Sequence, residues 1–366
     1  MDGKYSNSIN RWEGIGPYYA MFPAVFAQEV INKYTKEEDI IIDPFAGRGT
    51  SIFAAATNNR KGIGIEINPV GWLYAKVKLA PAPIDKVKES LISVDCVSNN
   101  YTDKIKSLPT FFEYCYDKRV LQFLLAARDQ LKWKTRGADA TLMALILVNL
   151  HGKYGNALSN QMRQTKSMSP KYAVEWWKKK GINPPKIDPK DFLSKRIEWR
   201  YRHGVPSLKK SIVYLGDSPT LLSKVKNDIE ADRYSRPSLL FTSPPYLGVT
   251  NYHYDQWLRL WMLGYADHPV MLTGKYQKRF IDIDDYKNLL SKVFNKSASL
   301  LKKNAIVYVR TDYRQTTYQI TKSALLQAFP NKKMEEKVQP LKNPSQTRLF
   351  KKDAIGVGEI DLIMKP

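Results

Sequence analysis

The sequence predicts an α/β fold built on one twisted, mostly parallel sheet with helices on both faces. Short apolar runs typical of buried strands occur at residues 40–42, 62–67, 211–215, 238–241 and 305–309. Glycine, proline or acidic residues follow most of these runs, which indicates where each strand ends. Stretches with helical spacing of apolar residues separate the runs, and this favours parallel strands joined by helices over hairpins.

The first half of this fold is expected in residues 1–79. The apolar spacing of residues 25–31 predicts an amphipathic helix with Pro23 near its first turn. A strand at 40–42, a glycine-containing turn, a helix at 50–57 and a strand at 62–67 follow. A strand, a glycine turn, a helix and a strand ending in an acid are typical of the first half of a nucleotide-binding α/β unit.

A helical, basic insertion is expected at residues 80–210, between the second and third strands. Apolar spacing predicts helices over 119–131 and 137–150, and Asn183–Pro185 predicts a loop. The second half of the α/β unit is expected in residues 211–366. It contains the strands at 211–215, 238–241 and 305–309, helices near 221–225, 255–264 and 286–302, and a final pair of strands within 336–364.

The composition favours an intracellular protein. With 366 residues, 43% of them hydrophobic, the chain can bury a sizeable core. The longest apolar run, Leu142–Leu150, is too short to span a bilayer, and Met1–Asn10 has no signal-peptide core. Two cysteines and four scattered histidines give neither a disulfide framework nor a metal-ligand spacing. We therefore expect a cytoplasmic protein with no metal site and no membrane partner.

The charge of the chain points to a polyanionic partner, since the formal net charge is +23. Residues 151–210 hold fifteen Lys and Arg against four Asp and Glu, with seven aromatic residues interleaved. Such a run is often only a solvated face, but cations mixed with aromatic rings also suit phosphate contacts and base stacking. The predicted nucleic-acid contacts are Arg163, Lys166, Lys178, Arg196, Arg200 and Arg202.

Residues 43–50 form a turn directly after the first strand, in which Gly47 and Gly49 allow a ligand to approach the backbone closely. The turn lacks the Gly-Lys-Ser/Thr ending of a P-loop and the Gly-x-Gly-x-x-Gly spacing of dinucleotide sites. Glu66 ends the next strand, where a carboxylate can accept both ribose hydroxyls. Asp217, at a third strand end, can accept from an adenine amino group. Alternatively, each acid caps a helix or forms a surface ion pair.

A second motif, Thr242-Ser243-Pro244-Pro245-Tyr246, ends the strand at 238–241. Successive prolines lack N–H groups and stop the strand, so their carbonyls are left as acceptors. Ser243 and a prolyl carbonyl can then accept the protons of a flat group that carries an NH2, while Tyr246 stacks on its face. Open α/β sheets bind ligands at this end of their strands. Taken alone, the motif fits a plain turn equally well.

Together these motifs resemble those of the S-adenosylmethionine-dependent DNA amino-methyltransferases, which methylate an exocyclic nitrogen of a DNA base. The resemblance covers the glycine turn, the strand end at Glu66, the Gly-Asp-Ser element at 216–218 and residues 242–246. It implies a Rossmann-like class I methyltransferase fold, S-adenosylmethionine as cofactor, and catalytic roles for Ser243, Pro244, Pro245 and Tyr246. The cofactor contacts that it implies are Tyr19, Phe22, Asp43, Pro44, Phe45, Ala46, Gly47, Gly49, Thr50, Glu66, Ile67, Asp217 and Ser218. For Tyr19 and Phe22, packing in the core is an equal alternative.

The order of the motifs and the first catalytic residue refine the resemblance. The cofactor turn precedes the catalytic motif, which looks like a circular permutation of the order in many relatives, with target recognition at 80–210. Serine at the first motif position favours cytosine N4 over adenine N6 as the methylated atom. The sequence contains no Pro-Cys nucleophile for carbon-5 methylation. A base inside a duplex must be flipped out to reach such a site.

Two other functions remain open from the sequence. One is an RNA or tRNA base methyltransferase, because a basic, aromatic insertion also suits RNA. The other is a non-catalytic DNA-binding protein on a methyltransferase fold, although the intact motifs argue against it. The expected partner is double-stranded DNA, and the resemblance makes a cognate restriction endonuclease a candidate partner.

Overall fold

The computed structural model describes residues 5–17, 22–248, 252–270, 280–339 and 358–366. The chain forms two compact units, each assembled from separate stretches of sequence. The sheet unit comprises residues 22–68, 208–251 and 271–366. The helical unit comprises residues 1–21, 69–207 and 252–270.

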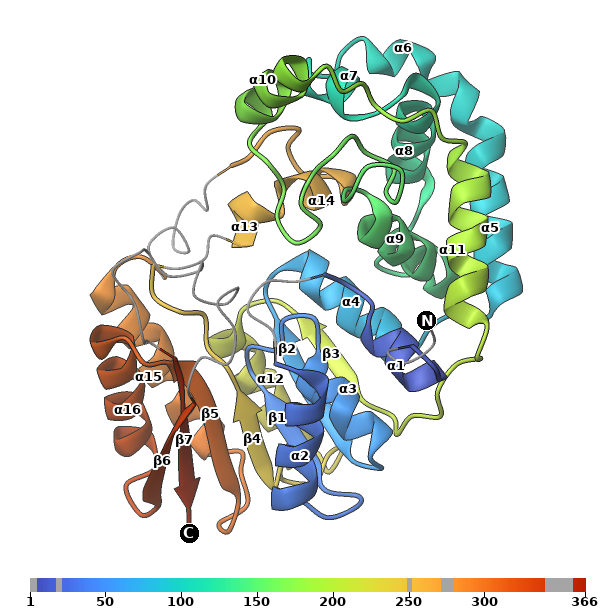
Figure 1. The fold of residues 1–366 in the computed structure, drawn as a ribbon. Coiled ribbons are helices and arrows are strands. Elements are labelled where there is room, and N and C mark those ends of the chain that lie inside the picture. Colours follow the sequence, from blue (N-terminus) through green and yellow to red (C-terminus); the bar gives the residue numbers. More distant parts are fainter. Residues whose placement is uncertain (1–4, 18–21, 249–251, 271–279, 340–357) are drawn as a thin grey trace. The chain divides into compact units, whose positions relative to one another are not determined.

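The described part of the sheet unit contains a seven-stranded sheet in the order β3-β2-β1-β4-β5-β7-β6 (Figure 1). Neighbours among β1 to β5 are parallel, whereas β7 runs antiparallel between β5 and β6. This confirms the predicted Rossmann-like, mostly parallel α/β sheet. The strands are β1 (Ile40–Asp43), β2 (Lys61–Glu66), β3 (Ile212–Leu215), β4 (Leu239–Thr242), β5 (Ile306–Asp312), β6 (Lys333–Gln339) and β7 (Glu359–Lys365).

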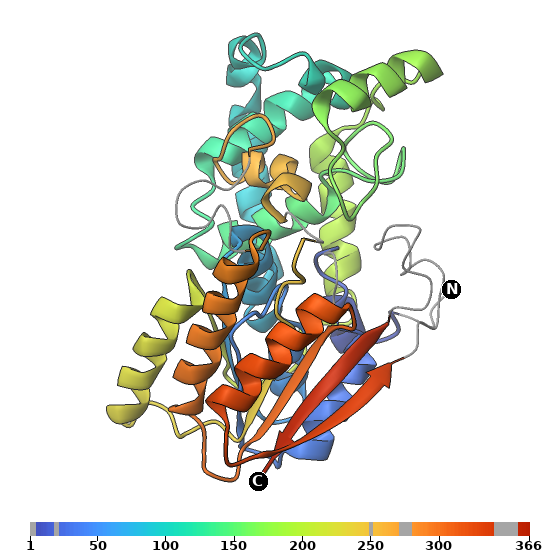
Figure 2. The ribbon, with the colours of Figure 1, turned by 90° about the vertical axis from the view of Figure 1, so that its left-hand side faces the viewer.

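Strand residues alternate between two hydrophobic cores, one on each face of the sheet. Ile40 and Ile42 of β1 belong to one core, and Ile41 between them belongs to the other. The first core is covered by α12 (Ser218–Glu230), α15 (Ile283–Ala298) and α16 (Gln315–Ala328). The second is covered by α2 (Ala24–Tyr34) and α3 (Thr50–Thr57). Figure 1 shows α2 beside β1, and Figure 2 shows α15 and α16 side by side against the sheet.

Glycines in β2 let α3 pack unusually close to the sheet. A Cβ placed on Gly62 would lie 2.6 Å from Cγ2 of Ile52, and one on Gly64 would lie 3.1 Å from Cβ of Ala46. A side chain at either position would push α3 away from β2. The glycines therefore fix the position of α3 and of the turn that precedes it.

The helical unit is built around α9 (Gly137–Asn149), in which every residue from Asp139 onward is buried. It packs against α4 and α5, and the absence of a continuous polar stripe explains why α9 is buried from Asp139 onward. The other helices of the unit are α1 (Ser8–Glu13), α4 (Pro69–Leu79), α5 (Ile84–Val97), η1 (Ser98–Tyr101), α6 (Thr102–Ile105), α7 (Phe111–Cys115), α8 (Lys118–Gln130), α10 (Pro170–Lys180), α11 (Pro189–Tyr201), α13 (Tyr252–Asp255) and α14 (Trp257–Met262).

This unit extends beyond the insertion expected at residues 80–210. Trp12 of α1 is fully buried, and its Nε1 donates to the carbonyl of Gly204 at 3.1 Å. The guanidinium of Arg259 on α14 is also fully buried and donates to the carbonyls of Leu147 at 3.0 Å and Gln164 at 2.5 Å. These contacts bring α1 and α14 into the helical unit, so the predicted boundaries at 79 and 210 capture only its central part.

Several element ends differ from the sequence expectation. The helix predicted at 255–264 is divided at Gln256 into α13 and α14, and β5 continues to Asp312 instead of ending at 309. Helices α10, α11 and α16 were not predicted individually. Charged and aromatic residues lie around α11 without a clear apolar stripe, so its sequence gives little periodic signal. Within the described residues, no helix combines the length and apolar character needed to cross a bilayer.

Candidate functional site

The two sequence motifs meet where the strand order of the sheet reverses. The turn at 43–50 follows β1 and the motif at 242–246 follows β4, and these strands are neighbours. From this pair, β2 and β3 continue to one side and β5 to the other. Ligands of open α/β sheets bind at this switch point, beyond the carboxyl ends of the strands. The hydroxyl of Thr242 donates to Oδ1 of Asp43 at 2.6 Å and joins the two motifs directly.

The buried side chain of Asp43 connects the glycine turn to the motif that follows β4. It is 2% exposed and accepts hydrogen bonds from the N–H of Phe45 and the hydroxyls of Ser51 and Thr242. Burial raises the pKa of its carboxyl to about 6, although the three donors oppose this shift. Asp43, predicted as a cofactor contact, therefore holds the turn in place from a buried position.

The glycine turn requires the conformational freedom of its two glycines. Gly47 has φ of 55° and Gly49 has φ of 75°, values in the left-handed region that favours glycine. The N–H of Gly49 donates to the carbonyl of Ala46 at 2.7 Å, and α3 begins at Thr50. Ala46 in turn donates to the carbonyl of Ile65 in β2 at 2.9 Å. The turn is thus fixed to two neighbouring strands.

Glu66 lies beside this turn at the end of β2. Its Oε2 accepts from the N–H of Gly47 and its Oε1 from the N–H of Asn68, both at 2.7 Å. Burial raises the pKa of Glu66 to about 7, with the backbone hydrogen bonds acting in the opposite direction. A carboxylate has about four acceptor positions, so it keeps capacity for a ligand hydroxyl. The structure thus places this predicted ribose ligand next to the predicted cofactor turn.

Asp217 and Ser218 follow β3, the next strand along the sheet. The N–H of Gly216 donates to the carbonyl of Glu66 at 2.9 Å, so the ends of β2 and β3 are joined. Asp217 is half-buried and precedes the first residue of α12. The hydroxyl of Ser218 donates to the carbonyl of Pro44 at 2.5 Å. Ser218 therefore uses its hydroxyl to support the turn.

The predicted catalytic motif is partly accessible. Ser243 and Pro245 are half-buried, whereas Pro244 is buried and Tyr246 is 6% exposed. The hydroxyl of Tyr246 donates to Oε1 of Glu359 at 2.9 Å. Burial is the main reason that the pKa of Tyr246 lies well above its usual value, so the phenol stays neutral. The motif can therefore offer hydroxyl and carbonyl acceptors together with a fixed aromatic ring.

A further arginine supports the residues after the motif. Arg314 donates from Nη2 to the carbonyl of Leu247 at 2.7 Å. The same guanidinium pairs with the fully buried Asp312 at 2.6 Å. Sequence reasoning missed Arg314, Asp312 and Glu359. A signal was present, because Asp312 is an acid shortly after a predicted strand, as at the other strand ends.

The remaining predicted cofactor contacts differ in how deeply they are buried. Phe22 stacks on Phe241 with the ring centroids 4.7 Å apart and the planes 10° apart, so it packs in the core. Tyr19 lies outside the described residues. Phe45 and Ile67 are half-buried, whereas Thr50 is buried at the start of α3.

The predicted nucleic-acid contacts all lie in the helical unit, and most of them are exposed. Arg163, Lys178 and Arg202 have exposed side chains. Lys166 is also exposed, and its Nζ pairs with Oδ1 of Asp255 at 2.6 Å. These four cations are accessible to a phosphate.

Two of the predicted cations are engaged inside the unit. Arg196 is half-buried and donates to the carbonyl of Asn156 at 3.0 Å. Arg200 is 6% exposed, donates to the carbonyl of Arg11 and lies over the ring of Trp199. Burial lowers the pKa of Arg200 to about 10. The assignment of Arg200 is therefore corrected, since it ties α11 to α1 instead of facing a phosphate.

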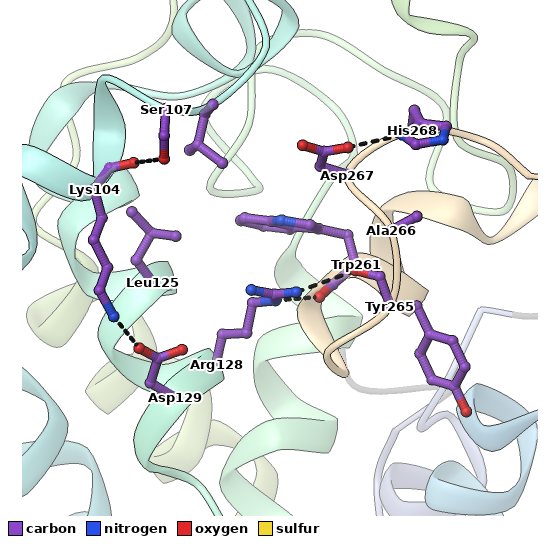
Figure 3. Close-up of a pocket in the computed structure, with 11 residues that line it drawn as sticks. Lys104, Ser107, Leu125, Arg128, Asp129, Trp261, Tyr265, Ala266, Asp267 and His268 are labelled. Atoms are coloured by element: carbon purple, nitrogen blue, oxygen red, sulfur yellow. Dashed lines mark hydrogen bonds and ion pairs between the residues drawn. The ribbon is translucent and has the colours of Figure 1, made fainter.

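The helical unit also contains a hollow of about 460 Å³ beside Trp261 (Figure 3). Arg128 donates there to the carbonyls of Trp261 at 2.8 Å and Tyr265 at 3.1 Å, and Lys104 pairs with Asp129 at 2.5 Å. Trp261 itself is 1% exposed. The polar groups of this wall already contact one another, so we assign the hollow no role. Among the described residues, no three His, Cys, Asp or Glu side chains group to hold a metal ion.

A family model described as DNA methylase matches residues 2–73, which include the glycine turn and Glu66. The chain is 36% identical over 81 residues to the type II methyltransferase M.MjaII of Methanocaldococcus jannaschii, covering 22% of this chain and 15% of the relative. It is 49% identical over 49 residues to the orphan methyltransferase M.BamHII of Bacillus amyloliquefaciens, covering 13% and 18%. It is 45% identical over 56 residues to the type II methyltransferase M.HindIII of Haemophilus influenzae, covering 15% and 18%.

The chain spans 15–18% of the length of these curated relatives. Among solved structures, the rRNA methyltransferase aviRa of Streptomyces viridochromogenes aligns over 96% of this chain and 90% of its own. The identity is 11% and the TM-score 0.33, a similarity too low to indicate a function. Residues 2–73 are therefore similar to the DNA methylase family, and the curated relatives that match short stretches of the chain are named as methyltransferases.

Proposed function

We propose that this protein transfers a methyl group from S-adenosylmethionine to an exocyclic amino nitrogen of a base in double-stranded DNA. The observation that carries the proposal is the hydrogen bond between Thr242 and Asp43. Residues 43–50 and 242–246 therefore lie side by side at the switch point of the sheet, which supports the proposal. A methyl donor and an acceptor amine held by these two motifs would therefore be neighbours.

The residues around the turn fit S-adenosylmethionine by the chemistry of their donors and acceptors. The left-handed Gly47 and Gly49 leave room for a ligand against the backbone. Glu66 supplies a carboxylate for the ribose hydroxyls, and Asp217 supplies an acceptor for the adenine amine. When bound, the cofactor supplies an electrophilic methyl group on a sulfonium. Alignment of this group with the amine is the main task left to the protein.

The catalytic motif prepares the amine. An exocyclic amine of a base is a poor nucleophile, because its lone pair is delocalised into the ring. The Ser243 hydroxyl and the Pro244 carbonyl accept hydrogen bonds from the NH2 group, which favours a pyramidal nitrogen with an available lone pair. Tyr246 stacks on the flipped base and offsets part of the cost of unstacking it.

The methylated atom in this proposal is N4 of cytosine. Serine at the first position of the motif supports cytosine, and adenine N6 is the alternative that the same site would accommodate. The exposed Arg163, Lys166, Lys178 and Arg202 contact the phosphate backbone of DNA. A cognate restriction endonuclease is the proposed functional partner, which agrees with the type II names of two relatives.

The test is transfer of labelled methyl groups to unmethylated duplex DNA, with tRNA in parallel, followed by mass spectrometry of the digested nucleosides. N4-methylcytosine is the expected product. N6-methyladenine would replace the base assignment only, whereas label in RNA alone would overturn the DNA proposal. Cofactor binding without transfer to any nucleic acid would favour a non-catalytic DNA-binding protein.

Variants of the motif test its catalytic role. Ser243→Ala should lower turnover at least about 100-fold, because one directed hydrogen bond to the reacting group is lost. Tyr246→Ala should abolish turnover, and both variants should keep cofactor affinity within about 2-fold, since neither residue lines the glycine turn. Ser238→Ala is the matched control, because its hydroxyl contacts Asp39 at the opposite end of β4. Loss of cofactor binding in Ser243→Ala would refute the separation of the two half-sites.

A further inference from the structure

Tyr246 reaches a carboxylate far away in the sequence. Its hydroxyl donates to Oε1 of Glu359, 113 residues further along the chain, at 2.9 Å. Glu359 is the first residue of β7 and lies opposite Asp312, the last residue of β5. Because β7 runs antiparallel to β5, its first residue lies at the same edge of the sheet as the carboxyl ends of the parallel strands. The chain thus brings a carboxylate to the site from a strand that carries no recognised motif.

Glu359 is itself held by a second set of contacts. Its Oε2 lies 3.4 Å from Nη1 of Arg310. Arg310 is 6% exposed, forms a bidentate pair with Asp361 at 2.7 and 2.9 Å, and lies 3.6 Å from the ring centroid of Phe26. A guanidinium fixed in this way gives the neighbouring carboxylate a defined orientation. One oxygen of Glu359 therefore faces Arg310 and the other faces Tyr246.

The hydrogen bond to Glu359 fixes the ring of Tyr246 beside the rest of the motif. The Tyr246 O–H points toward Glu359, because it donates to Oε1. With its hydroxyl held at this edge of the sheet, the ring keeps one orientation relative to Ser243 and Pro244 of the same motif. A ring held in one orientation is what stacking on a flipped base requires.

We propose that Glu359 is a positioning residue that fixes the ring of Tyr246 in the orientation that stacks on the substrate base. This inference rests on the proposed methyl transfer, because it assigns a role within that reaction. Glu359 touches neither base nor cofactor in this role. Its effect passes through the phenol oxygen, so it must disappear when that oxygen is removed.

The test compares Glu359→Ala, Glu359→Gln, Tyr246→Phe and the double variant Tyr246→Phe/Glu359→Ala. The substrate is a duplex that contains the site mapped from wild-type methylation, with 2-aminopurine at the target base in a parallel sample. The matched control is Glu336→Ala. Glu336 accepts from the hydroxyl of Tyr318 at 2.6 Å and pairs with Lys322 at 2.7 Å, so it repeats the same contacts away from the motif.

We expect Glu359→Ala to slow single-turnover transfer about 10- to 100-fold, because small misplacements of a reacting group have effects of this size. Cofactor affinity should stay within about 2-fold, and the 2-aminopurine signal of the flipped base should change. Glu359→Gln should restore most of the rate, since its amide oxygen can still accept from Tyr246. The double variant should be no slower than Tyr246→Phe. Equal rates for Glu359→Ala and Glu336→Ala, or multiplied losses in the double variant, would overturn the proposal.

A measurement without DNA separates this inference from the proposed function. With 3-fluorotyrosine at position 246, the ¹⁹F resonance should shift in Glu359→Ala and not in Glu336→Ala. If Glu359→Ala shifts the resonance but the wild-type protein methylates no DNA, the contact between Glu359 and Tyr246 is supported and the proposed function is rejected. If the wild-type protein methylates DNA but Glu359→Ala leaves the resonance unchanged, the inference is rejected and the proposed function is supported.

Discussion

The titration of Glu66 should be detectable in the pH dependence of protein stability. Burial raises the pKa of its carboxyl to about 7, from a usual value of 4.5. A group whose pKa is higher in the folded state stabilises the fold most below its unfolded pKa and loses this contribution as the pH rises through its folded pKa. The free energy of unfolding should therefore fall between about pH 4.5 and pH 7 because of this group.

Replacement of Glu66 by glutamine should flatten this part of the profile. The difference in slope between wild type and Glu66→Gln is at most about 1.4 kcal/mol per pH unit, the value for one proton. Denaturant unfolding at a series of pH values measures it. The buried Asp43 has a pKa raised to about 6 and its charge also raises the pKa of Glu66, so the difference between the two profiles reports Glu66 together with its interaction with Asp43. Parallel profiles would show that Glu66 titrates normally.

Cofactor binding should show the opposite pH dependence. Ribose hydroxyls donate to an ionised carboxylate, so bound S-adenosylmethionine favours the charged form of Glu66. Affinity should therefore increase between pH 6 and pH 8 in the wild type and remain nearly constant in Glu66→Gln. Calorimetric titration measures both. If the cofactor affinity of the wild-type protein does not change with pH, Glu66 is not the residue that binds the ribose hydroxyls.

At the scale of elements, the contact between β2 and α3 decides where the cofactor turn lies. Gly62→Ala would place a Cβ 2.6 Å from the stiff, β-branched side chain of Ile52 and 3.1 Å from its Cα. Because the backbone of Ile52 must move as well as its side chain, we expect Gly62→Ala to lower the stability by about 1–3 kcal/mol. Denaturant unfolding measures this loss, and calorimetry should show weaker cofactor binding.

Gly137→Ala is the matched control for this substitution. Gly137 begins α9, and a Cβ there meets nothing within 4 Å. Its stability should change by less than about 0.5 kcal/mol. Equal effects of the two substitutions would mean that the close approach of α3 to β2 is not a constraint.

At the scale of the whole molecule, the net charge of +23 predicts strongly salt-dependent DNA binding. Lys178 on α10 is exposed, so Lys178→Ala should weaken binding and reduce the slope of log K against log salt concentration by about 0.9, the value for one phosphate contact. Fluorescence anisotropy over a salt series measures the slope. Lys86→Ala is the control, because Lys86 is an exposed cation paired with Glu89 at 2.9 Å. An unchanged slope in Lys178→Ala would place Lys178 outside the DNA interface.

Much of the fold, and the positions of the glycine turn and of Glu66 at strand ends, could be predicted from the sequence, because they depend on neighbouring residues. Buried strands appear as apolar runs, and the left-handed Gly47 and Gly49 appear as glycines at a strand end. Glu66 is recognisable because it ends the strand after the turn. The boundaries of the two units were not predictable in this way. They depend on contacts such as that of Arg259 with Leu147, which join residues 112 positions apart.

The sequence by itself determined the α/β class and located the glycine turn at 43–50 and the motif at 242–246, because each is encoded within a few consecutive residues. The tertiary structure decided how these parts are used. It showed that Asp43 and Ser218 support the turn, that Arg200 is buried, and that Glu359 contacts Tyr246. Burial and long-range hydrogen bonds depend on which strands become neighbours in the sheet. That information lies in the packing of the whole chain and leaves no local pattern in the sequence.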